Sequence, residues 1–255
     1  RISLCSAGAW WALFTIFPMI NLKIRGNIEV VPRKESLITV GFKQLAGTFK
    51  NALNYPRTLI FLGAFLLYNE GVQTVIALSS QFGQEELGLG LDTLTTAILM
   101  VQFIAFFGAL AFKYLARAIN SKNAILISIV IWAGTLVYAY GFLDDKTGFF
   151  ILAGAIALVL GGIQALSRSL YSLVIPKGKE AEYFSFYEIT DRGTSWIGPL
   201  LFGLALQMTQ SYRIAILSLV VFFVLGFVIL LFINIPKAIR AAGNKVPETF
   251  KKFNF

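Results

Sequence analysis

Seven apolar runs make up most of this chain of 255 residues, and each is long enough to cross a lipid bilayer. A helix rises about 1.5 Å per residue, so about 20 residues cross a hydrocarbon core of about 30 Å. The runs are apolar on all sides, whereas helices of a soluble core would carry a polar face. The sequence therefore predicts an all-α polytopic membrane protein with seven transmembrane helices. The runs are Ile2–Leu22, Thr58–Gly83, Thr93–Phe112, Asn123–Leu143, Thr147–Ser167, Gly193–Tyr212 and Ile214–Pro236.

The basic residues orient these helices. When the connections are assigned alternately to the two sides of the membrane, 19 of the 22 Lys and Arg residues fall on one side. Positively charged connections are typical of the cytoplasmic face, so the chain is expected to start outside and end inside. The net charge of +9 is therefore interpreted as an orientation signal and not as a nucleic-acid surface, because no connection is long enough for a basic domain.

The spacing of the runs predicts four segments. The chain starts at Arg1, directly before an apolar run and without a signal-peptide layout, so we interpret it as a piece of a longer protein. Six closely spaced spans after a long cytoplasmic loop are typical of the second half of a twelve-span transporter. We expect residues 1–22 to be the last span of an N-terminal half, 23–57 a linker between halves, 58–236 a six-helix half and 237–255 a basic cytoplasmic tail.

The linker contains a candidate amphipathic helix on the cytoplasmic surface. Its apolar residues recur at steps of three and four, at Ile38, Phe42, Leu45, Phe49 and Leu53. Two interpretations are open, an interfacial tether and a regulatory or coupling helix.

Glu70 is the only formal charge inside any apolar run. A charge near the bilayer centre costs at least about 2.5 kcal/mol, so Glu70 should face the bundle interior or a wet cavity. Asn69 and Gln73 accompany it on the same helix, and Gln102 and Gln164 are polar groups in neighbouring spans. These five side chains are the candidate substrate- or proton-binding set. The alternatives are a structural hydrogen bond for Glu70 and contacts between helices for the glutamines.

A charged cluster precedes the sixth run. Glu188 and Arg192 have the i, i+4 spacing of a helical ion pair, and Asp191 lies beside them. The cluster is interpreted either as ordinary interface solvation or as a cytoplasmic latch whose ion pairs form and break during transport. In the fifth run, small residues recur every four positions and predict close helix packing: Ala153, Ala157, Gly161 and Ala165.

Three strings resemble the vacuole-effluxer-like family of the major facilitator superfamily. They are YNEGVQT at 68–74, GGIQALSRSLY at 161–171 and FYEITDRGTSWIGPL at 186–200. The resemblance implies a twelve-span permease that works by alternating access, of which this chain would hold spans six to twelve. It also implies a plasma-membrane protein in a bacterium, or a vacuolar one that exports amino acids in a fungus. The family commonly has an aspartate where this chain has Glu70. The superfamily's basic loop would fall at Gly108–Lys122, where only Arg117 matches.

The leading hypothesis is a secondary transporter of small polar solutes, with amino acids as the leading substrate class and a proton as the coupling ion. The expected cytoplasmic gate comprises Arg117, Arg168, Glu188, Asp191 and Arg192. The expected partners are the missing N-terminal half, the solute and membrane lipid, with no cofactor and no metal. The alternatives are a non-transporting scaffold or lipid scramblase and, less favoured, a lipid-modifying enzyme. The chain has no histidine and one cysteine, Cys5, which leaves an enzyme only Glu188 and Asp191 beside Ser185.

Overall fold

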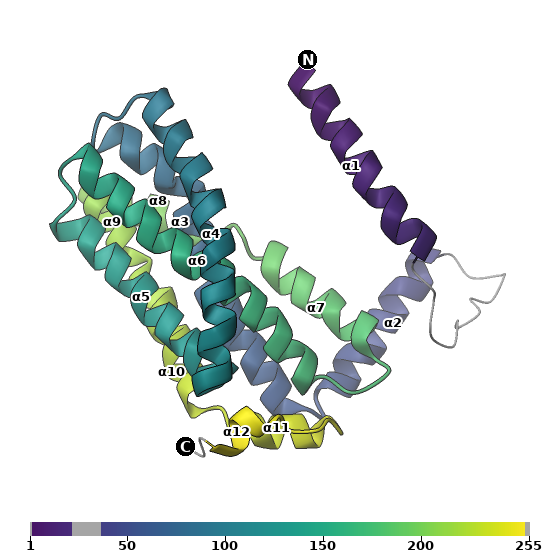
Figure 1. The fold of residues 1–255 in the computed structure, drawn as a ribbon. Helices are drawn as coiled ribbons and strands as arrows, with labels where there is room; N and C mark the ends of the chain where they lie inside the picture. Colours follow the sequence, from purple (N-terminus) through teal and green to yellow (C-terminus); the bar gives the residue numbers. More distant parts are fainter. Residues whose placement is uncertain (1, 22–36, 253–255) are drawn as a thin grey trace. The chain divides into compact units, whose positions relative to one another are not determined.

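The computed structural model describes residues 2–21 and 37–252, and all regular secondary structure in these residues is helical (Figure 1). The chain divides into two compact units, residues 1–42 and 43–255, which are considered separately. The helix bounds are α1 (Ile2–Asn21), α2 (Leu37–Ala52), α3 (Pro56–Glu85), α4 (Leu91–Ile119), α5 (Ser121–Gly141), α6 (Lys146–Val174), α7 (Glu180–Arg192), α8 (Ile197–Thr209), α9 (Tyr212–Ser218), α10 (Val220–Phe232), α11 (Ile235–Ala241) and α12 (Glu248–Lys252).

Six stretches of the described residues are long and apolar enough to cross a membrane. They are Ser3–Asn21, Pro56–Glu85, Leu91–Ile119, Ser121–Gly141, Lys146–Val174 and Tyr212–Phe232, the last of which joins α9 and α10. The predicted all-α membrane architecture is confirmed. These stretches correspond to six of the seven apolar runs.

The remaining run, Gly193–Tyr212, which is the sixth along the chain, does not form one long helix. Its helical part is α8, which has 13 residues. Helix α7 comes before α8 in the chain, and a turn at residues 193–196 separates the two helices. From the start of α7 to the end of α8 there are 30 positions, the length of α3. We therefore interpret α7 and α8 together as one discontinuous span.

Local signals at the helix ends explain where several elements begin. Pro56 lies in the first turn of α3, where a proline has no hydrogen bond to lose. The side chains of Asn120, Asp145 and Asn234 cap α5, α6 and α11 by accepting a hydrogen bond from a backbone N–H of the first turn. These caps fix where the three helices begin.

In the second unit the long helices pack side by side (Figure 1). Helix α4 lies along α6, and α10 contacts both α3 and α5. The close α4–α6 packing depends on Gly161, because a Cβ atom at this position would overlap the carbonyl oxygen of Ala105. This is the helix contact that the small-residue stripe predicts.

Arg213 joins the ends of three helices at the side assigned to the outside. Its guanidinium donates to Glu86 Oε1 at 2.6 Å and to Asp144 Oδ1 at 2.9 Å. It also donates to the backbone carbonyl of Leu143 at 2.8 Å. Because Arg213 presents several donors in a fixed plane, it connects the ends of α3, α5 and α9 at once.

The C-terminal part of α2 packs on α7. Thr48 is buried, and its hydroxyl donates to Glu182 Oε2 at 2.6 Å. The ring centroids of Phe49 and Phe186 lie 6.3 Å apart. The predicted helix in the linker is therefore present, and its second half is attached to the first half of the discontinuous span.

Candidate functional site

Asn69 and Glu70 lie at the middle of α3, and each has an exposed fraction of 1%. Adjacent residues on a helix point in directions about 100° apart, so the two side chains face different neighbours. Glu70 faces α8, and Asn69 faces α6 and α7. The site therefore has two halves that share one helix.

Glu70 binds the first turn of α8. The backbone N–H of Gly198, the second residue of α8, donates to Glu70 Oε1 at 2.7 Å. N–H groups in the first turn of a helix have no partner inside the helix, and the helix dipole favours a negative charge there. Among the described residues no basic side chain forms an ion pair with Glu70. Its charge is therefore satisfied by a helix end.

The sequence of α8 explains the break that creates this end. Pro199 has no N–H to donate to the carbonyl of Ser195, and the N–H of Gly198 is directed to Glu70 instead of back along the chain. Gly198 must also be small: a Cβ atom there would overlap the Thr74 hydroxyl and lie 2.8 Å from Thr74 Cβ. The Gly-Pro pair thus allows α8 to start against α3.

Asn69 forms the second half of the site. Gln164 Nε2 donates to Asn69 Oδ1 at 2.9 Å, and Asn69 Nδ2 donates to Asp191 Oδ1 at 2.7 Å. This chain of hydrogen bonds connects α6, α3 and α7. It brings Asp191, predicted to be part of the cytoplasmic gate, to the middle of α3.

An ion network extends from this site along α6 and α7. Arg168 Nη2 lies 3.4 Å from Glu188 Oε1, and Arg192 Nε lies 3.3 Å from Glu188 Oε2. The guanidinium of Arg168 also lies 5.6 Å from the ring centroid of the buried Tyr187. The charged side chains are half to largely exposed, so each pair contributes at most about 1 kcal/mol. Such pairs can separate at little cost.

An open pocket lies next to these groups. Its volume is about 470 Å³, and Gln164, Arg168, Ser169 and Ser172 supply its polar lining. Amide, guanidinium and hydroxyl groups are therefore accessible on one surface of α6. This surface could hydrogen-bond the polar groups of a small solute.

Three of the sequence-predicted residues lie apart from the cluster. Gln73 is partly buried, and its side chain makes no hydrogen bond to another described residue. Arg117 lines a separate pocket with Lys113, and neither Glu188 nor Asp191 pairs with it. Gln102 lines an apolar cavity of about 230 Å³ among α3, α4, α5, α6 and α9.

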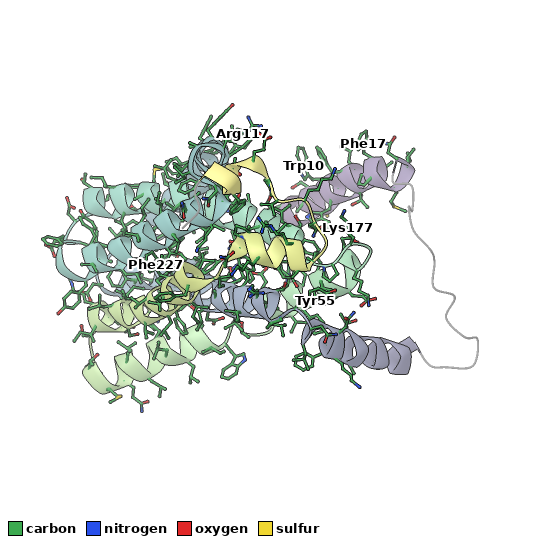
Figure 2. All side chains as sticks on the ribbon, turned by 90° about the horizontal axis from the view of Figure 1, so that it is seen from below. Trp10, Phe17, Tyr55, Arg117, Lys177 and Phe227 are labelled. Atoms are coloured by element: carbon green, nitrogen blue, oxygen red, sulfur yellow. The ribbon has the colours of Figure 1, made fainter. Side chains whose placement is uncertain are left out.

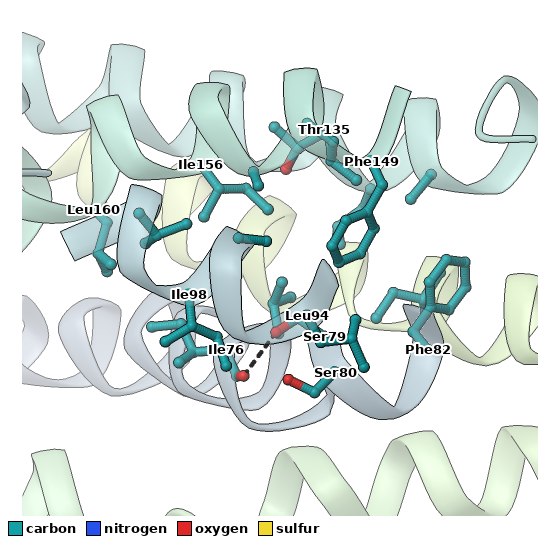
Figure 3. A pocket seen from close by; sticks show the side chains of 18 of the residues that line it. Ile76, Ser79, Ser80, Phe82, Leu94, Ile98, Thr135, Phe149, Ile156 and Leu160 are labelled. Atoms are coloured by element: carbon teal, nitrogen blue, oxygen red, sulfur yellow. Dashed lines mark hydrogen bonds between the residues drawn. The ribbon is translucent and has the colours of Figure 1, made fainter. Parts of the chain in front are cut away.

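Figure 3 shows this apolar cavity, with Ile76, Leu94, Phe149 and Ile156 on its walls. Three hydroxyl groups also line it, those of Ser79, Ser80 and Thr135, and two of them are directed to their own helix backbone. Ser79 donates to the carbonyl of Ile76 at 2.9 Å, and Thr135 donates to that of Trp132 at 2.7 Å. Gln102 and the Asn69 group therefore belong to two different environments.

The site also contains residues that sequence patterns did not single out for it. They are Gly198 and Thr74, and the Gly-Pro pair inside an apolar run was the sequence signal for Gly198. In the part of the chain that the structure describes, no group of three His, Cys, Asp or Glu side chains could hold a metal ion.

A comparison with models of known protein families identifies one family that matches this chain. The family model described as vacuole effluxer Atg22-like matches residues 1–243. The chain is 36% identical over 234 residues to an uncharacterized MFS-type transporter, YxiO, of Bacillus subtilis, and this match covers 91% of the chain and 53% of the relative.

Fungal proteins are also similar to this chain. It is 29% identical over 271 residues to autophagy-related protein 22 of Yarrowia lipolytica, covering 95% of the chain and 46% of that protein. With the protein of the same name in Eremothecium gossypii the identity is 28% over 253 residues, which covers 93% of the chain and 50% of the relative. No solved structure matches the chain.

The chain thus spans about half the length of the curated relatives it matches. Their names are those of a transporter and of autophagy-related proteins, and none is that of an enzyme. With a family model that covers nearly all of its residues and with helices that can cross a membrane, this chain is an integral membrane protein that belongs to the vacuole effluxer Atg22-like family.

Proposed function

We propose that the protein containing this chain is a secondary transporter of small polar solutes, with amino acids as the leading substrate class, and that it works by alternating access. The observation that carries the proposal is the hydrogen-bonded chain Gln164–Asn69–Asp191. It presents amide and carboxylate groups from three helices at the middle of α3, beside an open pocket. Polar groups at this depth are expensive, and in transporters they mark the solute pathway.

In this proposal Asn69, Gln164 and Asp191 hydrogen-bond the solute, and the partly exposed Gln73 extends the polar surface along α3. Gln102 lies in the apolar cavity and is not included. The remaining wall of the solute site would come from the missing N-terminal half, because cavities of this transporter class lie between the two halves.

The discontinuous span supplies the moving part. Glu70 keeps the start of α8 against α3, while Arg168, Glu188 and Arg192 connect α6 with α7 through exposed ion pairs. Breaking those pairs would let α7 tilt while α8 stays attached. A proton on Glu70 would weaken its hydrogen bond with the Gly198 N–H and release α8 as well. Glu70 is therefore proposed to act on the helix and to carry the coupling proton, without contacting the solute.

Counterflow in proteoliposomes that contain the full-length parent protein tests this function. A labelled amino-acid panel should exchange saturably, and Gln164→Ala should reduce exchange about tenfold, the size of one lost hydrogen bond to a polar solute. Gln207→Ala is the matched control, because Gln207 is an exposed residue of α8 outside the site. Exchange by the parent protein that Gln164→Ala leaves unchanged would contradict the proposed site.

The pH dependence of exchange tests the role of Glu70 separately. Glu70→Gln keeps an acceptor oxygen for the Gly198 N–H but cannot titrate, so exchange should continue and lose its dependence on pH. A parent protein that exchanges no member of the panel but moves labelled lipid between leaflets would favour the scramblase alternative.

A further inference from the structure

A second pocket lies at the end of the bundle assigned to the cytoplasm, next to the pocket of the proposed solute site, with which it shares Ser169. Its volume is about 460 Å³, and it is enclosed by α4, α6 and the C-terminal segment that includes α12. Its polar lining consists of Lys113, Arg117, Ser121, Ser169 and Thr249. Figure 2, a view from below, shows Arg117 beside the yellow C-terminal segment.

The two cations in this pocket have no acidic partner among the described residues. Lys113 and Arg117 are one helical turn apart and lie on the same face of α4. Neither forms an ion pair with a described carboxylate. The guanidinium of Arg117 lies 6.0 Å from the ring centroid of Tyr114, which contributes a cation–π contact and no negative charge. The pocket therefore has positive charge to offer to an anion.

Hydroxyl groups complete the donor set. Within the described residues, the hydroxyl groups of Ser121, Ser169 and Thr249 make no hydrogen bond. A lysine, a guanidinium and several hydroxyls around one cavity are the donors that phosphate oxygens accept from. This combination is better suited to a phosphate group than to a carboxylate, because a phosphate offers more acceptor atoms.

The C-terminal wall of the pocket is fixed to the bundle. Asn244 Nδ2 donates to the carbonyls of Leu173 at 2.9 Å and Ile175 at 2.8 Å, which are at the end of α6. Phe250 is buried, with an exposed fraction of 3%, and lines the same pocket. The pocket is thus built by packed elements and is not a gap under a loose tail.

An apolar surface on α4 ends beside this pocket, at Arg117. The exposed residues Phe103, Phe107, Leu110 and Tyr114 recur at steps of four, three and four, and Arg117 follows three residues later. Residues 103–117 extend for about 21 Å at about 1.5 Å per residue, which exceeds the thickness of about 15 Å of one hydrocarbon leaflet. An acyl chain could therefore lie along this surface while its headgroup occupies the pocket.

We propose that this pocket binds the phosphate headgroup of an anionic phospholipid from the cytoplasmic leaflet. The apolar surface on α4 favours a lipid over a free phosphate ester, which would use only the polar end of the pocket. The proposal also explains why Arg117 lies apart from the Arg168–Glu188–Arg192 network. Its role is lipid binding and not gating.

The test is a titration of the purified full-length parent in detergent with fluorescent phosphatidylglycerol, and with fluorescent phosphatidylcholine for comparison. Each basic side chain near an anionic lipid contributes about 1 kcal/mol, or about a fivefold change in affinity. Lys113→Gln with Arg117→Gln should therefore weaken phosphatidylglycerol binding about 10-fold or more and leave phosphatidylcholine binding unchanged. High salt should reduce the difference between the two lipids.

Two controls keep the result specific. Lys177→Gln with Lys237→Gln removes the same charge from exposed residues that do not line the pocket, and should leave binding unchanged. Lys113→Arg with Arg117→Lys keeps both charges and should retain most of the affinity, which separates loss of charge from loss of folding.

Three outcomes would overturn the proposal. The first is phosphatidylglycerol affinity that is the same in the double Gln variant and the parent. The second is a parent protein with no preference for phosphatidylglycerol, as expected if the missing half covers the pocket. The third is displacement of the lipid by millimolar inorganic phosphate, which would assign the pocket to a free phosphate compound.

Discussion

Glu70 shows how one carboxylate can be buried in a membrane helix without a basic partner. An acidic residue at the bilayer centre costs about 2.5 kcal/mol or more. A hydrogen bond to a charged group contributes about 1.5–3 kcal/mol, and a helix N-terminus adds up to about 2 kcal/mol in a buried geometry. The N–H of Gly198 provides both the hydrogen bond and the helix N-terminus. The stabilising free energy is therefore similar in size to the free-energy cost of burying the charge of Glu70.

At the same residue scale, Gly198→Ala should destabilise the protein. The added methyl group would overlap the Thr74 side chain and lie 3.2 Å from Glu70 Oε1. Overpacking of this kind costs about 1–3 kcal/mol, so the melting temperature of the full-length parent should fall by several degrees. Gly203→Ala in the same helix is the control, because a Cβ atom there has no neighbour within 4 Å. Adding Thr74→Ala should restore part of the loss, and equal melting temperatures for the two alanine variants would contradict the described packing.

At the scale of elements, α7 and α8 behave as two pieces with different attachments. Helix α8 is bound to α3 through Glu70. Helix α7 is bound to α3 through Asn69 and to α2 through Thr48. Because the turn at 193–196 separates them, a change in the attachment of α7 need not disturb α8. This arrangement connects α2 with the proposed solute site by a short physical path.

The α2–α7 attachment gives a prediction at this scale. Thr48→Val removes the hydrogen bond to Glu182, which should release the second half of α2. A bond to a carboxylate contributes about 1.5 kcal/mol or more, so trypsin should cleave after the exposed Lys50 about ten times faster or more. Limited proteolysis followed by mass spectrometry measures the rate. Thr96→Val is the control, because Thr96 donates within its own helix to Asp92; equal cleavage rates would show that Thr48 does not hold α2.

For the molecule as a whole, the orientation follows from charge alone. Excess Lys and Arg in alternate connections places Lys177 inside and Lys146 outside. In a cysteine-free background, an impermeant maleimide should label Lys146→Cys on intact cells and Lys177→Cys only after permeabilisation. Both side chains are exposed, so access does not bias the comparison. The reverse pattern would invert the assigned topology, and with it the location of the proposed lipid pocket.

A second prediction for the whole molecule concerns the N-terminal half that we propose precedes this chain. The chain spans about half of its relatives, and the polar groups of α3, α6 and α7 form one side of the proposed solute site. Reconstituted alone, the 255-residue chain should show no saturable counterflow, because a cavity between halves needs both halves. Co-expression with the preceding half of the parent should restore exchange. Saturable exchange by the chain alone would show that the solute site is complete within it.

The local chemistry of the sequence determined the membrane class and the helical fold, and Pro56 and Asn120 lie at helix starts a few residues before the predicted runs at Thr58 and Asn123. Length, apolarity and capping act within a few residues of the chain, so they can be recognised without the fold. The importance of Glu70 was also predictable, since a lone charge in an apolar run must have a partner. The division into four segments, 1–22, 23–57, 58–236 and 237–255, stays a prediction, and residues 22–36 of the linker lie outside the described residues.

Only the tertiary structure decided which partners these groups have. The Gly198 N–H is 128 positions from Glu70 in sequence, and Asp191 is 122 positions from Asn69. Such pairs depend on how α7 and α8 pack against α3. A hydropathy pattern cannot predict this packing, because it does not distinguish one apolar helix face from another. The same reason explains why Gln102 and Arg117 were grouped with residues that they do not contact. The sequence by itself determined that a polar centre must exist in this membrane protein, whereas the packing of a broken helix decided which residues form it.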